Sequence, residues 1–361
     1  MLCYLAPMEG ITTYIYRNAH AKYFGGIDKY FTPFISDKNI ISDKNIITDK
    51  NFIPDNDVIS GKIFIPEKSD ANVHNHIYQK NKSINARELR DILPENNVGI
   101  PLVPQVLTNN AGRFLAVAGQ AASYGYDAIN LNLGCPSGTV TAKKRGSGFL
   151  SIPDELDAFL YEIFEKCPLK ISIKTRLGIS DLKEWDRLLD IYAKYPIHEL
   201  IIHTRLQQEF YTGTAHPEAY AAAAARIQTR FPLCYNGDIV SPKSLEKISV
   251  RPDRIMIGRG IIQNPALAGH LRTDGQTSAR SGQKIPDQDV WRAFHDEILD
   301  GYIQIMSGDS PTLFKMKELW TYMSRSFTNP DKYLKKIRKA NRISEYVCAV
   351  DKLFREQEIS G

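Results

Sequence analysis

The sequence predicts an α/β fold, a (β/α)8 TIM barrel of parallel strands, followed by a smaller all-helical C-terminal domain. Eight short β-rich segments recur along residues 1–272, with segments of helical periodicity between them. Several of the β-rich segments are apolar on both faces, which is typical of parallel strands covered on both sides. Because 361 residues exceed the size of one barrel, we expect the barrel over residues 1–272 and the helical domain over residues 287–361.

The expected strands follow one another at spacings that suit a repeated strand–helix unit. They are residues 2–6, 29–34, 102–106, 128–133, 170–175, 199–203, 233–236 and 254–257. The segments 109–124 and 153–166 show helical periodicity and begin with Asn or with Pro-Asp-Glu, which are helix start signals. The interval between the second and third strands is the exception, because it is too long for one crossover helix in a compact domain.

A hexapeptide repeat occupies this long interval, at about residues 35–70. It begins ISDKNI, ISDKNI, ITDKNF and places isoleucine at positions 35, 41, 47, 53, 59 and 65. Such repeats can coil into a parallel β-helix, but these copies carry Asp-Lys-Asn where a packed solenoid needs small residues. We expect a mobile surface excursion outside the active centre, since polar repeats bury too little surface to offset the entropy of ordering.

Residues 272–286 are rich in Gly, Ser, Thr and Gln, which predicts a linker before the helical domain. Beyond the linker, apolar residues recur at spacings of three or four, as in amphipathic helices. Between Asp331 and Arg342, six basic residues stand against one acid, namely Lys332, Lys335, Lys336, Arg338, Lys339 and Arg342. This run is typical of a contact with phosphate groups of a nucleic acid, although a solvated helix face has the same composition.

Composition and charge narrow the class of protein. The net charge of +5 permits an acidic partner without demanding a nucleic acid. No uncharged apolar run is long enough to span a membrane, and the N-terminus lacks the basic and apolar regions of a signal peptide, so we expect a cytoplasmic protein with no membrane contact. The five cysteines are odd in number and widely spread, without any CxxC pair, which predicts free thiols and no metal site. We also expect a monomer.

Polar residues end almost every expected strand. They are Pro7-Met8-Glu9-Gly10 after the first strand, Gln105 in the third, Asn132 and Gly134-Cys135-Pro136 in the fourth, Lys174 and Arg176 in the fifth, His203 and Arg205 in the sixth, Asn236-Gly237-Asp238 in the seventh and Gly258-Arg259-Gly260 in the eighth. Active sites of (β/α)8 barrels lie at the C-terminal ends of the strands. We therefore expect these residues to form one active site.

The last two strand ends suit a phosphate group, because glycines let backbone N–H groups approach the oxygens and Arg259 adds a charge-assisted bond. Asn-Gly and Gly-x-Gly are also ordinary turn sequences. Lys174 ends an otherwise apolar strand, where an amine needs an anion or an electron-rich ligand; the pyrimidine edge of a flavin would serve, and so would a neighbouring carboxylate. His203, taken alone, is more typical of a buried, hydrogen-bonded structural histidine.

Cys135 lies in a loop with glycines at positions 134, 138, 146 and 148. A thiol at the mouth of a barrel, beside an inferred flavin, is a candidate nucleophile or general acid. A cysteine between Gly and Pro can also be purely structural.

The strand-end motifs together resemble the tRNA-dihydrouridine synthase family. The resemblance runs in order over residues 1–35 and about 84–270, and that family also has a helical C-terminal domain. The motifs are APMEGIT at 6–12, TPFIS at 32–36, VPQVL at 103–107, NLGCPS at 132–137, KTRLG at 174–178, HTR at 203–205, YNGDI at 235–239 and IGRG at 257–260. Two features depart from the family pattern: the hexapeptide insertion, and Leu206 where a Thr commonly follows the Arg.

The resemblance implies an FMN-dependent enzyme that reduces uridine in the tRNA D-loop with electrons from NADPH. The implied FMN contacts are Pro7, Met8, Gln105, Lys174, His203, Asn236, Gly237, Asp238, Gly258 and Arg259. The expected tRNA contacts are Asn132, Arg176, Arg205, Lys335 and Arg338. Cys135 would be the proton donor, since a thiol with an ordinary pKa of about 8.5 is still protonated at pH 7.

Two alternatives remain open from the sequence. The first is a flavin-dependent barrel oxidoreductase that acts on a free pyrimidine or an enone, which would not need a basic helical domain. The second is a catalytically idle tRNA-binding protein built on the same barrel.

Overall fold

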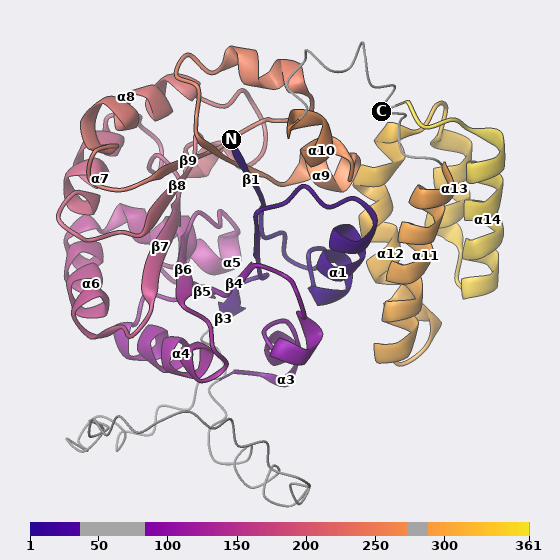
Figure 1. Cartoon of the computed structure of the whole chain (residues 1–361), viewed down its shortest axis with the longest axis horizontal. Helices are drawn as coiled ribbons and strands as arrows, with labels where there is room; N and C mark the ends of the chain where they lie inside the picture. The colour runs from indigo at the N-terminus through magenta and orange to yellow at the C-terminus, as the bar shows by residue number, and fades with distance from the viewer. Residues whose placement is uncertain (37–83, 273–287, 361) are drawn as a thin grey trace, which may run out of the picture.

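The computed structural model describes residues 1–36, 84–272 and 288–360. Figure 1 shows a ring of strands and helices on one side and an all-helical region, coloured orange to yellow, on the other. Nearly all of the hexapeptide repeat and of the expected linker lies outside the described residues, so the surface excursion and the linker stay predictions.

Ten short strands form the sheet, and all of the pairings between them are parallel. Their bounds are β1 Leu2–Leu5, β2 Lys29–Phe31, β3 Ile35–Ser36, β4 Leu102–Val103, β5 Gln105–Leu107, β6 Ala128–Leu133, β7 Lys170–Thr175, β8 Glu199–His203, β9 Leu233–Asn236 and β10 Arg254–Ile257. The last five expected strands are confirmed with their bounds. The first ends at Leu5, one residue before its expected end. The second ends at Phe31, with Ile35–Ser36 as a further piece beyond its expected end. The third is divided at Pro104, whose ring nitrogen cannot donate to a ladder.

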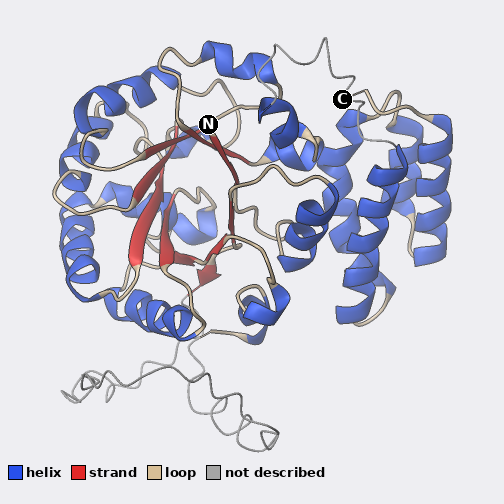
Figure 2. Cartoon of the chain, in the orientation of Figure 1, coloured by secondary structure: helices blue, strands red, loops and turns tan. Residues whose placement is uncertain are grey.

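The strand pairing closes the sheet into a barrel. β2 pairs with β4 and β3 pairs with β5, so both pieces of the second strand meet both pieces of the third. β1 pairs with β10 in the register Leu2 to Arg254, which joins the first strand to the last. Eight strand positions therefore form a closed ring inside a layer of helices, as Figure 2 shows, and the predicted (β/α)8 barrel is confirmed.

One sequence boundary needs correction. The repeat was expected to begin at Ile35, outside the barrel, but Ile35 and Ser36 form β3. Ile35 is buried in the hydrophobic core and pairs with Val106 in β5. The part of the repeat that leaves the barrel therefore begins after Ser36.

The helices around the barrel are α1 Tyr14–Tyr23, α3 Ala86–Arg90, α4 Ala111–Ser123, α5 Gly138–Thr141, α6 Pro153–Lys166, α7 Glu184–Tyr192, α8 Pro217–Ile227, α9 Arg259–Gln263 and α10 Leu267–Arg272. Local sequence accounts for their starts. The side chain of Asn110 accepts a hydrogen bond from the backbone N–H of Arg113 and caps α4. Pro153 opens α6, with two acids in its first turn.

The barrel interior is closed at the end where the strands begin. The carboxylate of Glu199, buried at the start of β8, accepts hydrogen bonds from Tyr4 Oη at 2.7 Å and Lys29 Nζ at 3.1 Å. Arg254 Nε lies 3.2 Å from the same carboxylate. These charges satisfy one another at this end of the barrel. We call the opposite end, where the strands end, the mouth of the barrel.

Four α-helices make up the described C-terminal region: α11 Gln288–Ile305, α12 Asp309–Met323, α13 Asp331–Lys339 and α14 Ile343–Glu356. The expected helical character is confirmed. α11 packs on α1, where Thr13 Oγ1 and Tyr302 Oη lie 3.0 Å apart and a Cβ added to Gly301 would lie 2.7 Å from Ile15. Buried residues of both regions belong to one hydrophobic core, so the division into two domains at residue 272 stays a prediction.

Candidate active site

The register of the strands brings the expected site residues to one end of the barrel. Asn132 in β6 pairs with Lys174 in β7, and His203 in β8 pairs with Asn236 in β9. These are the last or next-to-last residues of their strands. The side chains from neighbouring strand ends therefore meet at the mouth. Lys335 and Arg338 lie elsewhere, exposed on α13.

A ladder of buried amides supports the loop that carries Cys135. Gln105 Nε2 donates to Asn130 Oδ1 at 2.8 Å, and Asn132 Nδ2 donates to Gln105 Oε1 at 2.7 Å. Asn132 Oδ1 then accepts from the backbone N–H groups of Gly134 and Cys135, both at 3.0 Å. The amides thus fix the start of the loop relative to β5 and β6. Asn130, in the middle of β6, was not identified from the sequence.

Cys135 is half-buried, and the return of its own loop packs against it. The carbonyl of Cys135 accepts hydrogen bonds from the N–H of Ser147 at 3.0 Å and from Ser147 Oγ at 2.9 Å. Gly146 has φ +53, and a Cβ there would lie 2.7 Å from the Cys135 carbonyl oxygen, so only glycine fits. Burial raises the pKa of the Cys135 thiol, which keeps it protonated near pH 7.

Lys174 is a half-buried amine. Within the described residues no carboxylate forms an ion pair with it, so the predicted alternative of an internal salt bridge is not observed there. Burial and the nearby Arg176 guanidinium lower the pKa of Lys174 to about 8. An amine in this position is suited to an anionic or electron-rich ligand.

Arg176 joins two loops of the mouth. Its guanidinium is buried and donates to three backbone carbonyls: to Gly134 at 2.9 Å, to Leu206 at 2.7 Å and to Phe210 at 2.6 Å. The loop after β6 is thereby tied to the loop after β8. Arg176 therefore holds these two loops in place relative to each other. A contact between Arg176 and the substrate stays a prediction.

An arginine–carboxylate cluster lies beside His203. Arg205 is 1% exposed and donates to both carboxylate oxygens of Asp238, which is 40% exposed. Arg259 also donates to Asp238, at 2.7 Å. Burial, followed by the nearby cations, holds the pKa of His203 well below its usual range, so its ring is neutral at pH 7.

Tyr211 is a site residue that the sequence did not reveal. Its ring is 56% exposed, and the guanidinium carbons of Arg176 and Arg259 each lie 5.4 Å from its centroid. The ring of His203 lies 6.2 Å from it. Tyr211 lies in an irregular loop, several residues beyond the end of β8. No sequence pattern therefore indicated that its side chain would reach the mouth.

The loops after β9 and β10 pack tightly on each other. A Cβ on Gly260 would lie 2.1 Å from the carbonyl oxygen of Ile239. A Cβ on Gly258 would lie 3.4 Å from Met8 Sδ, in the loop after β1. Asn236 Nδ2 donates to the carbonyl of Met256 at 2.8 Å. Gly260, in the motif after β10, thus allows a close approach of backbone, of the kind that a cradle for a phosphate requires.

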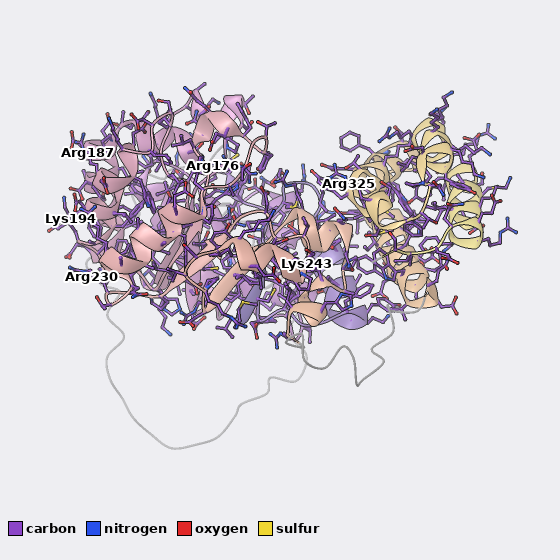
Figure 3. The ribbon with its side chains drawn as sticks, turned by 90° about the horizontal axis from the view of Figure 1, so that it is seen from above. Arg176, Arg187, Lys194, Arg230, Lys243 and Arg325 are labelled. Carbon is purple, nitrogen blue, oxygen red and sulfur yellow. The ribbon has the colours of Figure 1, made fainter. Side chains whose placement is uncertain are left out.

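The helical region borders the mouth. Lys315 Nζ in α12 donates to the carbonyl of Gly10, in the loop after β1, at 2.9 Å. In the view from above (Figure 3), Arg187, Lys194 and Arg230 lie at the far side of the barrel from the helical region, which carries Arg325. A large ligand at the mouth therefore has the helical region on one flank.

The fold defines a (β/α)8-barrel protein, and its candidate site lies at the carboxyl ends of the strands. The family model described as dihydrouridine synthase matches residues 71–358, and the chain belongs to that family. Within the described residues, no helix is long and apolar enough to cross a membrane. All five cysteines are free.

Two curated relatives illustrate the similarity to this family. A Staphylococcus aureus (strain Mu50) protein named "Probable tRNA-dihydrouridine synthase" is 34% identical over 172 residues, covering 46% of this chain and 52% of that protein. A Bacillus subtilis (strain 168) protein named "Probable tRNA-dihydrouridine synthase 2" is 32% identical over 170 residues, with the same coverage. The chain thus spans about half the length of these curated relatives. N-acetylneuraminate lyase from Mycoplasma synoviae is 10% identical, with a TM-score of 0.42, over 88% of this chain and 84% of that one.

Proposed function

We propose that this protein is an FMN-dependent enzyme that reduces the C5=C6 bond of a uridine in the tRNA D-loop, with NADPH as the source of electrons. The observation that carries the proposal is the pair formed by Cys135 and Lys174. A half-buried, protonated thiol and a half-buried amine without a carboxylate partner among the described residues lie at neighbouring strand ends, in a member of the dihydrouridine synthase family.

The residues at the mouth fit a flavin mononucleotide. The amine of Lys174 suits the electron-rich N1–C2 edge of an isoalloxazine ring, and the neutral His203 lies beside it. The closely packed glycine loops and Arg259 suit the phosphate. The proposed FMN contacts are Pro7, Met8, Gln105, Lys174, His203, Asn236, Gly237, Asp238, Gly258 and Arg259. Bound FMN, reduced by NADPH, would supply the hydride.

The chain's own contribution to the reaction is the proton. After hydride addition at C6 of the uracil ring, negative charge is delocalised over C5 and the C4 carbonyl, and the thiol of Cys135 donates its proton to C5. Burial raises the pKa of this thiol, whereas Lys174 and Arg176 act in the opposite direction and stabilise the thiolate that is left. Ser147 and Asn132 hold the backbone of Cys135 in place.

The helical region would hold the tRNA beside the mouth. Lys335 and Arg338 are exposed on α13 and form no ion pair with any described carboxylate, as expected of residues that contact phosphates. Because the target base must leave its stack to reach Cys135, contacts on both regions help to hold the RNA in an opened form. Asn132, Arg176 and Arg205 are the proposed contacts at the mouth.

Single-turnover oxidation tests the proposal. The purified protein should be yellow and bleach with NADPH, and the reduced flavin should reoxidise without oxygen when tRNA lacking dihydrouridine is added. Mass spectrometry of that tRNA should then show a gain of two hydrogens in a D-loop uridine. Oxidation by a free pyrimidine or an enone, but not by tRNA, would favour the first alternative enzyme. A protein that binds tRNA but no flavin would instead be an idle binding protein.

A further inference from the structure

The loop that carries Tyr211 to the mouth contains a strained turn. Phe210, the residue before Tyr211, has φ +50 and ψ −106, which side chains other than glycine rarely adopt. The Phe210 ring is exposed, so its own packing contributes little to holding this conformation. A strained residue persists only where the contacts around it fix the backbone. The support for this turn must therefore come from its neighbours.

The carboxylate of Glu209 joins the two ends of this loop. Its Oε2 atom accepts the backbone N–H of Leu206 at 2.6 Å, and its Oε1 atom lies 2.7 Å from Nε2 of His216. The backbone N–H of His216 donates in turn to the carbonyl of Thr204 at 2.7 Å. Glu209 and His216 thus hold the backbone on both sides of Tyr211.

The geometry around His216 requires a protonated ring. Its other ring nitrogen, Nδ1, lies 3.2 Å from Oε1 of Glu218 in α8. Because ionised carboxylates only accept hydrogen bonds, both ring nitrogens must donate, as they do in the imidazolium cation. Partial burial opposes this charge, but the hydrogen bonds and charges of Glu209 and Glu218 prevail and raise the pKa of His216. The charge of Arg205 in turn helps to keep Glu209 ionised.

We propose that the imidazolium of His216 is a positioning residue for the mouth, because its ion pair with Glu209 holds the loop that bears Tyr211. A neutral His216 has one N–H for two carboxylates, so one of its ring nitrogens then turns a lone pair toward an anion. The strained turn at Phe210 loses part of its support, and the loop opens more often. This stabilisation is complete below about pH 6.5 and is lost as the pH rises through the raised pKa of His216.

The consequence for tRNA rests on the proposed function, whereas the hold of His216 on the loop does not. Tyr211 lies beside His203 at the mouth, where the uridine would enter. If only the closed loop accepts the base, the apparent affinity falls with the closed fraction, and saturating tRNA restores the rate. Loss of the His216 proton should therefore raise the tRNA concentration that gives half-maximal flavin reoxidation, with little effect on the maximal rate.

Hydrogen exchange of residues 206–213 in the FMN-loaded protein measures the hold on the loop without catalysis. After correction for intrinsic rates, exchange in the parent should be about 2- to 10-fold faster at pH 9 than at pH 6, because a charged hydrogen bond at a half-exposed site is lost. His216→Gln should exchange fast at both pH values, and His216→Lys, which keeps its charge and a donor, slowly at both. His198→Gln is the matched control, since His198 is an exposed histidine just before β8 and should leave the parent behaviour unchanged.

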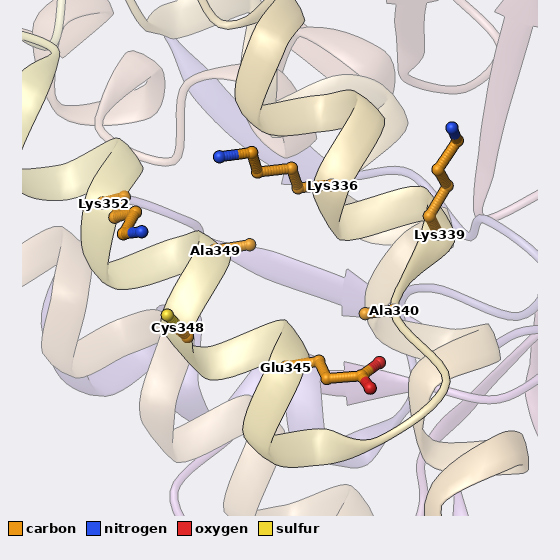
Figure 4. Close-up of a pocket in the computed structure, with 7 residues that line it drawn as sticks. All are labelled: Lys336, Lys339, Ala340, Glu345, Cys348, Ala349 and Lys352. Atoms are coloured by element: carbon orange, nitrogen blue, oxygen red, sulfur yellow. The ribbon is translucent and has the colours of Figure 1, made fainter.

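Glu345 provides a reference within the same protein. Figure 4 shows its carboxylate, on α14, turned toward the chain that follows Ala340. Like Glu209, it accepts backbone N–H groups of preceding residues, from Asn341 at 2.9 Å and from Arg342 at 3.4 Å. The cations that act on it are Arg342 and Lys317, and arginine and lysine side chains do not titrate near neutral pH. Corrected exchange of residues 341–345 should therefore be the same at both pH values.

Two results of the exchange experiment would overturn the proposal. One is a loop whose exchange changes with pH no more than that of residues 341–345. The other is a His216→Lys protein that exchanges as fast as His216→Gln, because a restored charge should restore the hold.

Flavin reoxidation at increasing tRNA concentrations separates the proposal from the proposed function. At pH 6, His216→Gln should need about 2- to 10-fold more tRNA than the parent for half-maximal rate, and His216→Lys should be close to the parent. Equal requirements in the parent and His216→Gln would overturn the positioning role. A reduced flavin that tRNA reoxidises at no pH would overturn the proposed function instead, and the exchange data would still decide whether His216 holds the loop.

Discussion

Arg205 at the mouth of the barrel donates to both carboxylate oxygens of Asp238, so the loop after β8 is tied to the loop after β9 by one ion pair. The pair is asymmetric, because the guanidinium is buried and the carboxylate is partly exposed. The main contribution of Asp238 to stability should therefore be that it accepts hydrogen bonds from a buried cation.

Asp238→Ala should destabilise the protein by about 1–3 kcal/mol, because it leaves buried donors of Arg205 without their acceptor. Asp154→Ala is the matched control, since Asp154 pairs with Arg187 on the exposed outer surface at 2.6 Å, and its loss should cost less than about 1 kcal/mol. Urea unfolding of both variants checks this. Equal losses of stability in the two variants would show that the Arg205–Asp238 pair contributes no more than the exposed Arg187–Asp154 pair.

Gly260→Ala should disrupt the loops after β9 and β10, because the added Cβ would lie 2.1 Å from the Ile239 carbonyl oxygen. We expect a loss of stability of about 1–3 kcal/mol, as for other overpacked sites, together with weaker flavin binding. Gly269→Ala is the control, since nothing lies within 4 Å of a Cβ there and alanine favours the helix. Thermal unfolding with and without FMN distinguishes the two, and a Gly260→Ala protein as stable as Gly269→Ala would contradict the model of close approach.

The half-buried amine of Lys174 should make stability depend on pH in a defined direction. Its pKa is about 8 in the folded protein against about 10.4 in an unfolded chain, so between these values the unfolded state binds more protons. The free energy of unfolding of flavin-free protein should therefore rise by about 1–3 kcal/mol from pH 8 to pH 10.4, relative to Lys174→Met. If the free energies of unfolding of the parent and of Lys174→Met changed with pH in the same way, the lowered pKa of Lys174 would be ruled out. Lys174→Met should also lose flavin or slow its reduction.

Cys135→Ala should keep its fold, its yellow colour and its reduction by NADPH, because none of these needs the thiol. Without the proton donor, oxidation of the reduced flavin by tRNA should slow by about 10²- to 10⁴-fold. Stopped-flow absorbance under anaerobic conditions measures this rate. If the variant reoxidises at the parent rate, the thiol is structural and another group, such as an ordered water, supplies the proton.

Charge reversal on α13 should weaken tRNA binding without changing the flavin. The Lys335→Glu/Arg338→Glu variant should lower the salt slope by about 1–2, because up to two phosphate contacts are lost. Lys166→Glu/Lys170→Glu is the control at the opposite end of the barrel, just before and at the start of β7. Fluorescence anisotropy with labelled tRNA gives both slopes. Identical behaviour of the two variants would identify the α13 face as merely solvated.

Much of the fold could be predicted from the chain alone. β6 to β10 agree with the expected strands because their sequences are short β-rich segments, several of them apolar on both faces, as parallel strands covered on both sides are. The alternation of these runs with helical periodicity was enough to predict the barrel, and the barrel predicted where the polar strand ends would meet. The boundary of the repeat was missed because Ile35 belongs to both patterns, and only burial against the third strand decided between them.

The sequence by itself determined the fold class, the order of the strands and the set of polar residues at their ends, since each follows from a local pattern of side chains. The tertiary structure decided what those residues contact. Arg176 reaches three carbonyls from two loops, Arg205 and Arg259 share Asp238, and Tyr211 enters the mouth from an irregular loop. These contacts join segments that are far apart along the chain, and their distances are set by strand register and loop packing, which no local pattern encodes.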